Sequence, residues 1–255
     1  MKVKVLGCSA VELPHARLTS FLVDDRLLLD AGTIGTVLHE KQQSKVRHVL
    51  LTHAHLDHIK DLPFLADNIA LHNKNRHLKV YSISDVISAL KTNIFNDIVW
   101  PDFTKIPTSE APIIRLETIR AGKSFKVDGF RVTAYEVNHA APAVAYLIED
   151  KKQKKLLYTG DTGPNTKIWQ SLDTTHLHAL ITEVSLPNIQ KNIALKAGHL
   201  TPVLLKKELE KMKRLPDTIF ITHFKPVYKK KVQQELKELN ISNIRLLKDG
   251  DVHEI

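Results

Sequence analysis

Three histidines and an aspartate stand close together in residues 50–58 (LLTHAHLDH), directly after an apolar run. An extended chain would direct His53 and His55 to one side, and a helical turn after His55 would bring Asp57 and His58 towards them. Imidazole nitrogens and carboxylate oxygens are ligands that zinc and related ions take from proteins. This spacing suits two adjacent metal ions, and the alternatives are a surface cluster of titratable residues or histidines at the start of a helix.

Further candidate ligands follow other apolar runs. His139 comes after the run that ends at Asn138, Asp161 comes after residues 156–160, and His223 comes after residues 219–222. Each has an alternative on its own, because a histidine at the end of a strand is often merely exposed and residues 160–163 could form a simple turn. Functional groups of α/β proteins gather at the carboxyl ends of strands, so we expect these side chains to meet the first cluster.

The elements that must position these side chains arrive in two similar blocks of strands and helices. We expect strands at residues 3–6, 20–23, 26–29, 48–51, 79–82, 131–136, 143–148, 155–158, 179–182 and 218–222. We expect helices at residues 62–73, 84–93 with Ser84 as N-cap, 203–213 after Thr201 and Pro202, and 229–239. Residues 151–155 (KKQKK) are predicted to be a solvated hairpin tip. Two such halves predict an α/β fold, a four-layer αββα sandwich, in one domain spanning residues 1–255.

The composition narrows the class of protein. Of the 255 residues 43% are hydrophobic and 25% are charged, which excludes disordered and fibrous chains. Cys8 is the only cysteine, so the chain has neither an internal disulfide nor a zinc cage of thiolates. The formal net charge of +9 favours an anionic partner or substrate. The sequence contains no apolar run long enough to cross a membrane, so we expect a soluble, cytoplasmic protein with no membrane partner.

With these motifs the sequence resembles the metallo-β-lactamase fold hydrolases over nearly its whole length. Residues 27–32 (LLLDAG) match the first motif of that superfamily, residues 53–58 the second, and His139, Asp161 and His223 the remaining three. The resemblance implies that His53, His55 and His139 hold one metal ion, that Asp57, His58 and His223 hold another, that Asp161 bridges both, and that Asp30 supports the site without binding metal.

Within the superfamily the chain is most similar to class II 3′,5′-cyclic-nucleotide phosphodiesterases. Residues 93–96 with 99–103, 198–202 and 221–226 carry this likeness, as do residues 55–59, whereas Asp61 stands where that family prefers glycine or serine. The resemblance implies hydrolysis of cyclic AMP or cyclic GMP to 5′-nucleotides through a metal-bridging hydroxide. It also implies two divalent ions, Zn²⁺ with Mn²⁺ or Fe²⁺ as alternatives, and a homodimer.

The expected catalytic residues are Asp57, which also binds metal, and the pair His199 and Glu183. His199 would protonate the leaving oxygen with Glu183 orienting it, as a similar pair does in ribonuclease Z; the alternatives are a loop residue and a surface acid without duties. Trp100, Phe103 and Phe95 could flank a base, Asn96 could read its edge, and Lys225 could meet the phosphate. Aromatic residues at such positions are otherwise core residues, and Lys225 is otherwise a solvated side chain.

Three other functions compete with this one. The positive charge would suit an RNA-processing endonuclease like ribonuclease Z, but a Gly/Pro-rich arm to grip tRNA is missing from the sequence, so nucleic acid is the less favoured partner. Another phosphodiester, a thiol ester or a lactone could be the substrate of the same site. A purely structural metal site is disfavoured because such sites are closed and rich in thiolates.

Overall fold

The described part of the chain, residues 1–72 and 77–255 of the computed structural model, contains two mixed sheets. The first sheet is built from β1 (Lys2–Gly7), β2 (Ser20–Val23), β3 (Leu27–Leu29), β4 (His48–Leu50), β5 (Leu78–Ser82), β6 (Ile114–Thr118) and β14 (Val252–Glu254), in the order β14-β1-β2-β3-β4-β5-β6. The second is built from β7 (Ser124–Val127), β8 (Phe130–Glu136), β9 (Val144–Glu149), β10 (Lys155–Tyr158), β11 (Ala179–Glu183), β12 (Thr218–Thr222) and β13 (Ile244–Leu246), in the order β13-β12-β11-β10-β9-β8-β7. Strands β3 to β6 and β10 to β13 are parallel within their sheets, and the remaining pairs are antiparallel.

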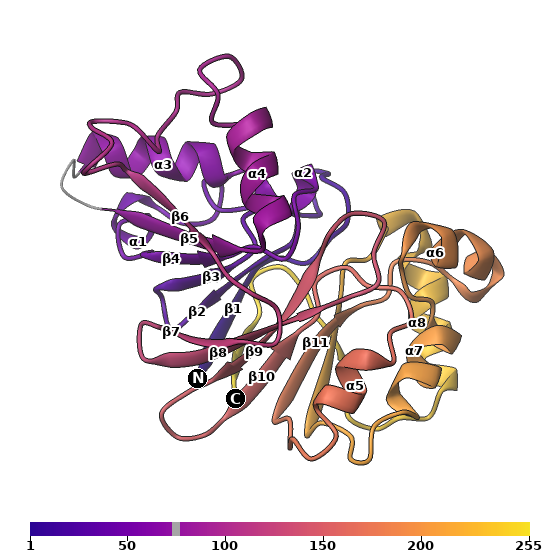
Figure 1. The fold of residues 1–255 in the computed structure, drawn as a ribbon. Coiled ribbons are helices and arrows are strands. Elements are labelled where there is room, and N and C mark those ends of the chain that lie inside the picture. The colour runs from indigo at the N-terminus through magenta and orange to yellow at the C-terminus, as the bar shows by residue number, and fades with distance from the viewer. Residues whose placement is uncertain (73–76) are drawn as a thin grey trace.

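Helices cover the outer face of each sheet (Figure 1). The first sheet carries α1 (Glu40–Gln43), α2 (Leu56–Ile59), α3 (Leu62–His72) and α4 (Ser84–Asn93). The second carries α5 (Lys167–Ser171), α6 (Lys191–Ala197), α7 (Pro202–Leu209) and α8 (Lys229–Glu238), with the short 3-10 helices η1 (Asn188–Gln190) and η2 (Pro226–Tyr228).

Three apolar layers hold this arrangement together. Strand β3 shows how, because Leu27 and Leu29 point between the two sheets while Leu28 points to the helices α1–α4. A third layer fills the space between the second sheet and its helices, with Leu157 of β10 and Leu205 of α7 among its members. A strand that is buried on both faces reads as a continuous apolar run, which is why β3 is leucine throughout. The predicted four-layer αββα sandwich is confirmed.

The elements differ from the prediction in a few places. The strands β6, β7, β13 and β14 were not expected; these four are the edge strands of the two sheets, and most of their residues are exposed or partly exposed. Ser84 is the first residue of α4 rather than its N-cap, which is Ile83. Helix α7 ends at Leu209, earlier than predicted, whereas the Thr201 cap and Pro202 at its first position are confirmed. The predicted end of the helix after residue 61, at Asn73, lies outside the described residues.

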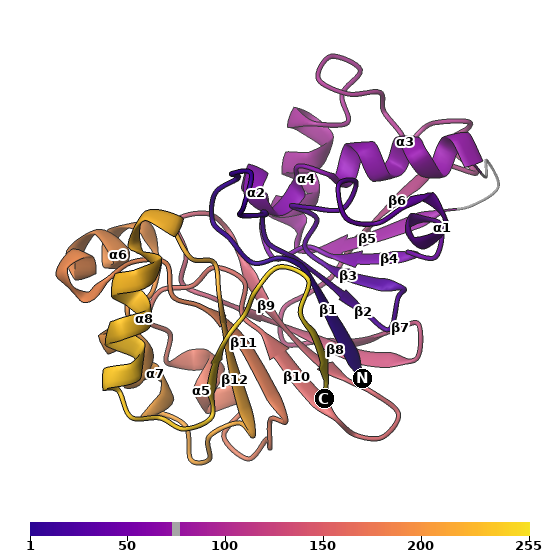
Figure 2. The ribbon, with the colours of Figure 1, turned by 180° about the vertical axis from the view of Figure 1, so that it is seen from behind.

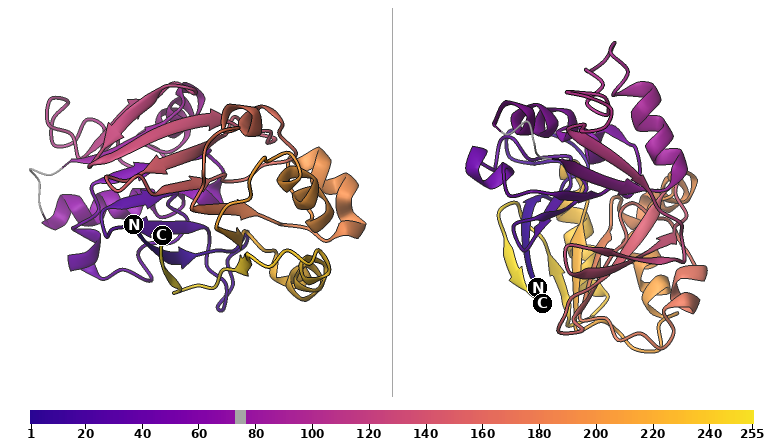
Figure 3. Two further views of the ribbon diagram at one scale, coloured as in Figure 1. Left: turned by 90° about the horizontal axis from the view of Figure 1, so that it is seen from below. Right: turned by 60° about the vertical axis from the view of Figure 1, so that its left-hand side comes forward.

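The chain returns to its first half near its C-terminal end. Strand β14 leaves the second half and pairs with β1 at the edge of the first sheet, with Lys2 opposite Glu254 (Figure 2). The two ends of the described chain therefore lie side by side, as the view from below shows (Figure 3). None of the helices in the described residues is long and apolar enough to cross a membrane.

Candidate metal centre

Polar side chains from both halves of the fold converge at one edge of the sandwich. The contributing segments are the loop and helix α2 after β4 (His53, His55, Asp57, His58), the segment after β8 (His139), the turn after β10 (Asp161), the end of β11 (Glu183), the loop before α7 (His199) and the residue after β12 (His223). Strand β4 is parallel to β3, and β10, β11 and β12 are parallel to one another; the carboxyl ends of these strands meet at this edge. The sequence motifs that lie far apart in the chain are thus brought together.

Two groups of ligand atoms share the carboxylate of Asp161. One group consists of His53, His55, His139 and Asp161, the other of Asp57, His58, Asp161 and His223, and in each the ligand atoms lie within 4.8 Å of one another. In the first group His139 Nε2 lies 3.2 Å from His55 Nδ1, so His55 presents its Nδ1 to the group. The third side chain, His53, is fully buried, with its Nε2 3.8 Å from Asp161 Oδ2.

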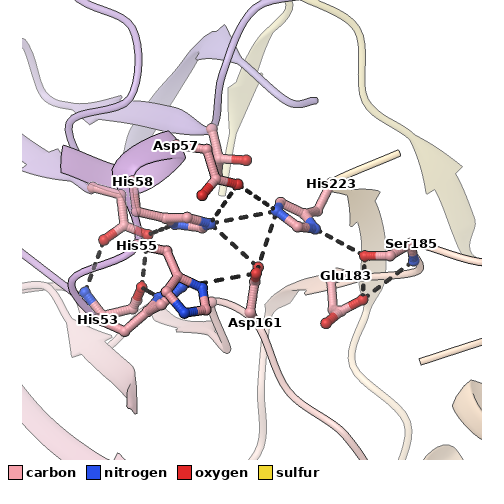
Figure 4. A network of polar contacts seen from close by, with 12 residues as sticks. His53, His55, Asp57, His58, Asp161, Glu183, Ser185 and His223 are labelled. Carbon is pink, nitrogen blue, oxygen red and sulfur yellow. Dashed lines mark hydrogen bonds and ion pairs between the residues drawn. The ribbon is translucent and has the colours of Figure 1, made fainter. Parts of the chain in front are cut away.

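The second group is the more tightly drawn of the two (Figure 4). His223 Nε2 lies 3.1 Å from Asp57 Oδ2, 3.3 Å from Asp161 Oδ2 and 3.4 Å from His58 Nε2. His58 Nε2 lies 3.4 Å from Asp161 Oδ1. Asp57 is partly exposed and His55 is exposed, so the centre opens to solvent on the side of helix α2.

These residues fit divalent metal ions. The buried atoms His53 Nε2 and Asp161 Oδ1 make no hydrogen bond, which is costly unless another group meets them. Nitrogen and carboxylate oxygen donors without thiolate suit zinc, manganese or iron. The predicted ligands all lie in the two groups, which supports metal binding at this centre.

Four of the ligand histidines, all except His55, make a hydrogen bond through Nδ1 on the side away from the centre, so that Nε2 faces the centre. His139 Nδ1 donates to Gly198 O at 2.9 Å, and His223 Nδ1 contacts Ser185 Oγ at 2.8 Å. Such contacts fix the orientation and tautomer of a metal-binding imidazole. Ser185 was not among the predicted site residues.

Asp30, which is fully buried, orients His53 and His58 in the same way. Its Oδ2 accepts hydrogen bonds from His58 Nδ1 at 2.7 Å, Thr52 Oγ1 at 2.8 Å and Tyr158 OH at 2.6 Å, and its Oδ1 accepts from Thr52 N at 2.8 Å. Thr52 Oγ1 in turn lies 3.0 Å from His53 Nδ1. Asp30 lies behind the ligands, as a residue that supports the site without touching metal would, and Thr52 and Tyr158 are partners that the sequence did not reveal.

The buried charges set the protonation of the ligands. Burial lowers the pKa of His53 well below its usual range, and neighbouring His58 lowers it further. Burial raises the pKa of Asp161, but His223 and His58 outweigh this effect and hold that pKa well below its usual range. Burial lowers the pKa of His58, yet Asp161 and Asp30 overcome it and raise that pKa well above normal. A metal ion would therefore find Asp161 ionised and would displace a proton from His58.

His199 and Glu183 form a pair beside the second group. His199 Nδ1 lies 2.5 Å from Glu183 Oε1, and its ring stacks on that of His223 with the ring centroids 5.6 Å apart. Glu183 is fully buried and also accepts hydrogen bonds from Thr162 N at 3.0 Å and Ser185 Oγ at 2.6 Å. Burial lowers the pKa of His199, but the Glu183 carboxylate more than compensates and raises it. The imidazole is thus oriented and favoured in its protonated form at the edge of the centre.

The structure does not support all of the expected substrate contacts. Phe103 and Phe95 are 5% and 1% exposed and belong to the core between the first sheet and its helices, so neither ring is free to stack on a base. The Asn96 amide is used within its own turn, accepting from Ile98 N and Val99 N and donating to Thr92 O. The stacking predictions for Phe95 and Phe103 are wrong, because both rings pack into the core, whereas the contact expected of Asn96 stays a prediction.

The substrate contacts expected of Trp100 and Lys225 stay predictions. Trp100 packs edge-on against Phe64 with ring centroids 4.9 Å apart, and its indole Nε1 is buried without a partner among the described residues. Lys225 lies close enough for its charge to act on His199, where it lowers the pKa against the stronger effect of Glu183. That Lys225 meets the phosphate of a substrate therefore stays a prediction.

Asp61, the departure from the family pattern, is turned away from the centre. It is 7% exposed, and its Oδ2 accepts hydrogen bonds from Ile34 N at 2.6 Å and Gly35 N at 2.9 Å. This carboxylate therefore does not oppose a bound phosphate. We expect Asp61→Ala to lower the free energy of unfolding by about 1–3 kcal/mol, because two backbone N–H groups lose their acceptor. Urea denaturation measures the change; Asp67→Ala, a partly exposed carboxylate on α3, should cost less than about 0.5 kcal/mol, and equal losses would contradict this role.

Gly198 is required by the backbone around His139. Its φ is +69°, and a Cβ atom there would lie 2.6 Å from His139 Cα. Gly198→Ala should displace His139 and weaken metal binding in the first group about 10–100-fold, the size of effect seen when a metal ligand loses its support. A metal titration measures this. Gly122→Ala is the matched control, because Gly122 has φ +76° and nothing within 4 Å of a Cβ, so it should keep metal affinity; equal losses in both variants would refute the steric explanation.

Comparisons with known proteins agree with this architecture. The chain is 28% identical over 228 residues to a Yersinia pestis protein named a probable 3′,5′-cyclic-nucleotide phosphodiesterase; the match covers 80% of this chain and 63% of that protein, so the chain spans less than two thirds of this relative. It is 23% identical to ribonuclease Z of Archaeoglobus fulgidus, over 84% of this chain and 82% of the relative. The structure of unliganded yeast PDE1 superimposes with a TM-score of 0.80 at 17% identity, over 97% of this chain and 98% of that one.

A family model described as the beta-lactamase superfamily domain matches residues 25–224, well over half of the chain. That stretch runs from the strand before Asp30 to the residue after His223, so it contains every candidate metal ligand. The chain belongs to the beta-lactamase superfamily and has its metallo-β-lactamase fold.

Proposed function

We propose that the chain is a metal-dependent phosphodiesterase that hydrolyses 3′,5′-cyclic nucleotides to 5′-nucleotides. The observation that carries the proposal is the pair of ligand groups joined at Asp161, with His199 and Glu183 directly beside them. The relatives named as cyclic-nucleotide phosphodiesterases support the choice of substrate.

Two divalent ions are proposed, one in each ligand group, with Zn²⁺ the first choice and Mn²⁺ or Fe²⁺ the alternatives. Bound ions supply Lewis acid chemistry, which activates water and neutralises the charge that develops on phosphoryl oxygens. The residues do the positioning: His53, His55 and His139 would hold one ion, Asp57, His58 and His223 the other, and Asp161 both. The hydrogen bonds of Asp30 and Ser185 keep these side chains aimed at the centre.

His199 is proposed as the general acid. When the ring of a cyclic phosphate opens, the departing 3′ oxygen of the ribose must take up a proton, because an alkoxide is a poor leaving group. His199 Nδ1 is occupied by Glu183, so its Nε2–H is the proton available for transfer. Lys225 is proposed to attract the phosphate to this side of the centre.

The homodimer expected from the resemblance stays a prediction, which light scattering in solution tests.

The pair should shape the pH dependence of turnover. Because Glu183 raises the pKa of His199 and burial alone would lower it, His199 stays protonated to a higher pH than an ordinary histidine. We expect kcat to fall on the alkaline side as this proton is lost. Glu183→Gln should move that fall to lower pH, which a pH–rate profile of both proteins measures. An alkaline limb at the same pH in both would contradict the pairing.

A second candidate function is RNA cleavage of the ribonuclease Z kind. The excess of 37 basic over 28 acidic residues and the likeness to archaeal ribonuclease Z favour it. Polyanion binding releases counterions, so cleavage of RNA should weaken steeply as salt rises, whereas turnover of a small cyclic nucleotide should change little.

One experiment separates the candidates. The purified protein is incubated with cyclic AMP, cyclic GMP, a cyclic dinucleotide and a pre-tRNA, with and without a chelator, at low and high salt. Conversion of cyclic AMP to 5′-AMP that stops with the chelator and tolerates salt is the expected result. Cleavage of pre-tRNA alone would refute the cyclic-nucleotide proposal, and turnover that survives the chelator would refute the metal requirement.

A further inference from the structure

A cavity lies next to the chain segment that carries His223. It has a volume of about 340 Å³ and is lined by Cys8, Ser9, His15, Phe224, Lys229, Lys248 and Asp249, among others. The residue between the two sites is His223, whose ring faces the metal centre while its backbone N–H donates to Cys8 O at 2.8 Å. The cavity therefore lies behind the chain segment that carries a candidate metal ligand.

The positive charge of this cavity is only partly balanced within the protein. Neither Lys229 nor Lys248 has a carboxylate within ion-pair distance among residues 1–72 and 77–255. The one acid in the wall, Asp249, is occupied: its Oδ1 accepts from Cys8 N at 3.1 Å and Cys8 Sγ at 3.3 Å, and its Oδ2 accepts from Arg17 N at 3.0 Å. The wall therefore carries two ammonium groups against the one carboxylate of Asp249, with Asp251 next to it accepting from Lys248 N at 2.9 Å.

The Lys229 side chain lies against the wall of this cavity. Its Nζ sits 5.9 Å from the centre of the Phe224 ring, which is almost fully buried. Burial and Asp249 raise the pKa of the Cys8 thiol, and Lys229 acts against them, which places the ammonium charge close to the same wall. Lys229 also stands in the first turn of α8, where no acidic residue balances it and where a cation is unfavourable. The charge of Lys229 at this end of the helix lowers the stability of the protein unless an anion balances it.

We propose that this cavity is a phosphate-binding subsite, distinct from the metal centre, in which Lys229 and Lys248 hold the phosphate. Lysine binds phosphate as a point charge, and two lysines with no carboxylate partner are suited to a group of this charge. The cavity is within the size range of ligand sites, about 300–1,000 Å³, and exceeds the need of a phosphate ion. The phosphate would come either from the free ion or from a second phosphate of a nucleotide ligand. The proposal does not depend on hydrolysis at the metal centre.

Amide chemical shifts of the metal-loaded protein test this subsite residue by residue. Titration with inorganic phosphate, and separately with the dinucleotide pApA, should shift the amides of Ser9 and Asp249 in a saturable way. In the double variant Lys229→Gln, Lys248→Gln these shifts should require at least about tenfold more ligand, because each lost charged contact is worth about a factor of ten or more. Lys237→Gln, at the far end of α8, is the matched control and should bind as the unchanged protein does.

The outcomes separate the subsite from the metal centre. Tighter binding of pApA than of inorganic phosphate identifies a nucleotide as the source, and equal binding identifies the free ion. Shifts confined to amides around His53 and Asp161, or shifts at Ser9 and Asp249 that persist in the double variant, would overturn the subsite. Because the readout is binding, a protein inactive on every cyclic nucleotide could still show the subsite, and an active one could lack it.

Discussion

Asp161→Ala should remove metal from both ligand groups at once and reduce phosphodiester turnover about a thousandfold or more. The carboxylate belongs to both groups, with Oδ2 3.8 Å from His53 Nε2 of the first group and Oδ1 3.4 Å from His58 Nε2 of the second. Loss of several kcal/mol of charge stabilisation in the transition state corresponds to a rate decrease of this order. Elemental analysis of the purified variant gives the metal content, and hydrolysis of bis(p-nitrophenyl) phosphate gives the rate.

Asp57→Ala is the matched control for this experiment. Asp57 belongs to the second group alone and is partly exposed, so its removal should weaken one ion and spare the other. If Asp161→Ala retained one metal in full, the carboxylate would not bridge. Circular dichroism of both variants distinguishes loss of metal from loss of the fold, because Asp161 is 2% exposed and its removal also leaves a buried space.

His199→Ala should lower kcat on cyclic AMP by about 10²–10⁴-fold with little change in KM, as expected for the removal of a general acid. The effect should depend on the leaving group. A p-nitrophenyl phosphodiester releases a weakly basic phenolate that needs no proton, so the same variant should lose less than about tenfold on it. Steady-state kinetics with both substrates measure the difference.

The control for this prediction is His176→Ala. His176 forms an ion pair with Asp217 at 2.8 Å, outside the metal centre, so its replacement should leave both rates unchanged. Equal losses of His199→Ala on the two substrates would show that His199 aligns the centre or binds substrate and does not transfer a proton.

The sequence predicted the ligands because their types and places are both restricted. The run from His53 to His58 is dense in metal-binding groups, and His139, Asp161 and His223 each follow an apolar run that becomes a strand. For Asp161 and His223, chain geometry then determines that the carboxyl ends of parallel strands meet, whereas β8, before His139, is antiparallel to both of its neighbours. The sandwich could be predicted for a similar reason, because long apolar runs in two blocks imply two sheets that are buried on both faces.

The supporting residues could not be found in the same way. Hydroxyl residues such as Thr52, Tyr158 and Ser185 are common in any chain, and only the structure shows that their oxygens touch Asp30, Glu183 or a ligand histidine. One weak signal existed: Ser185 stands two residues after Glu183, on the same side of an extended chain.

The stacking predictions for Phe95 and Phe103 were wrong for a different reason. A phenylalanine stabilises a protein by leaving water, and the sequence does not tell whether it enters a ligand cavity or the interior. Phe95 and Phe103 enter the interior beside α4 and the first sheet. The edge strands β13 and β14 were missed because exposed strands need few apolar residues, and their pairing depends on partners far away in the chain.

The position of the centre across the two halves of the sandwich has a mechanical consequence. Helix α2 and its preceding loop belong to the half with the first sheet, whereas Asp161 and His223 belong to the half with the second sheet. An ion bound by residues of both halves would link the two halves. It would raise the free energy of unfolding by an amount that grows with the logarithm of the free ion concentration, so the protein would melt at a higher temperature.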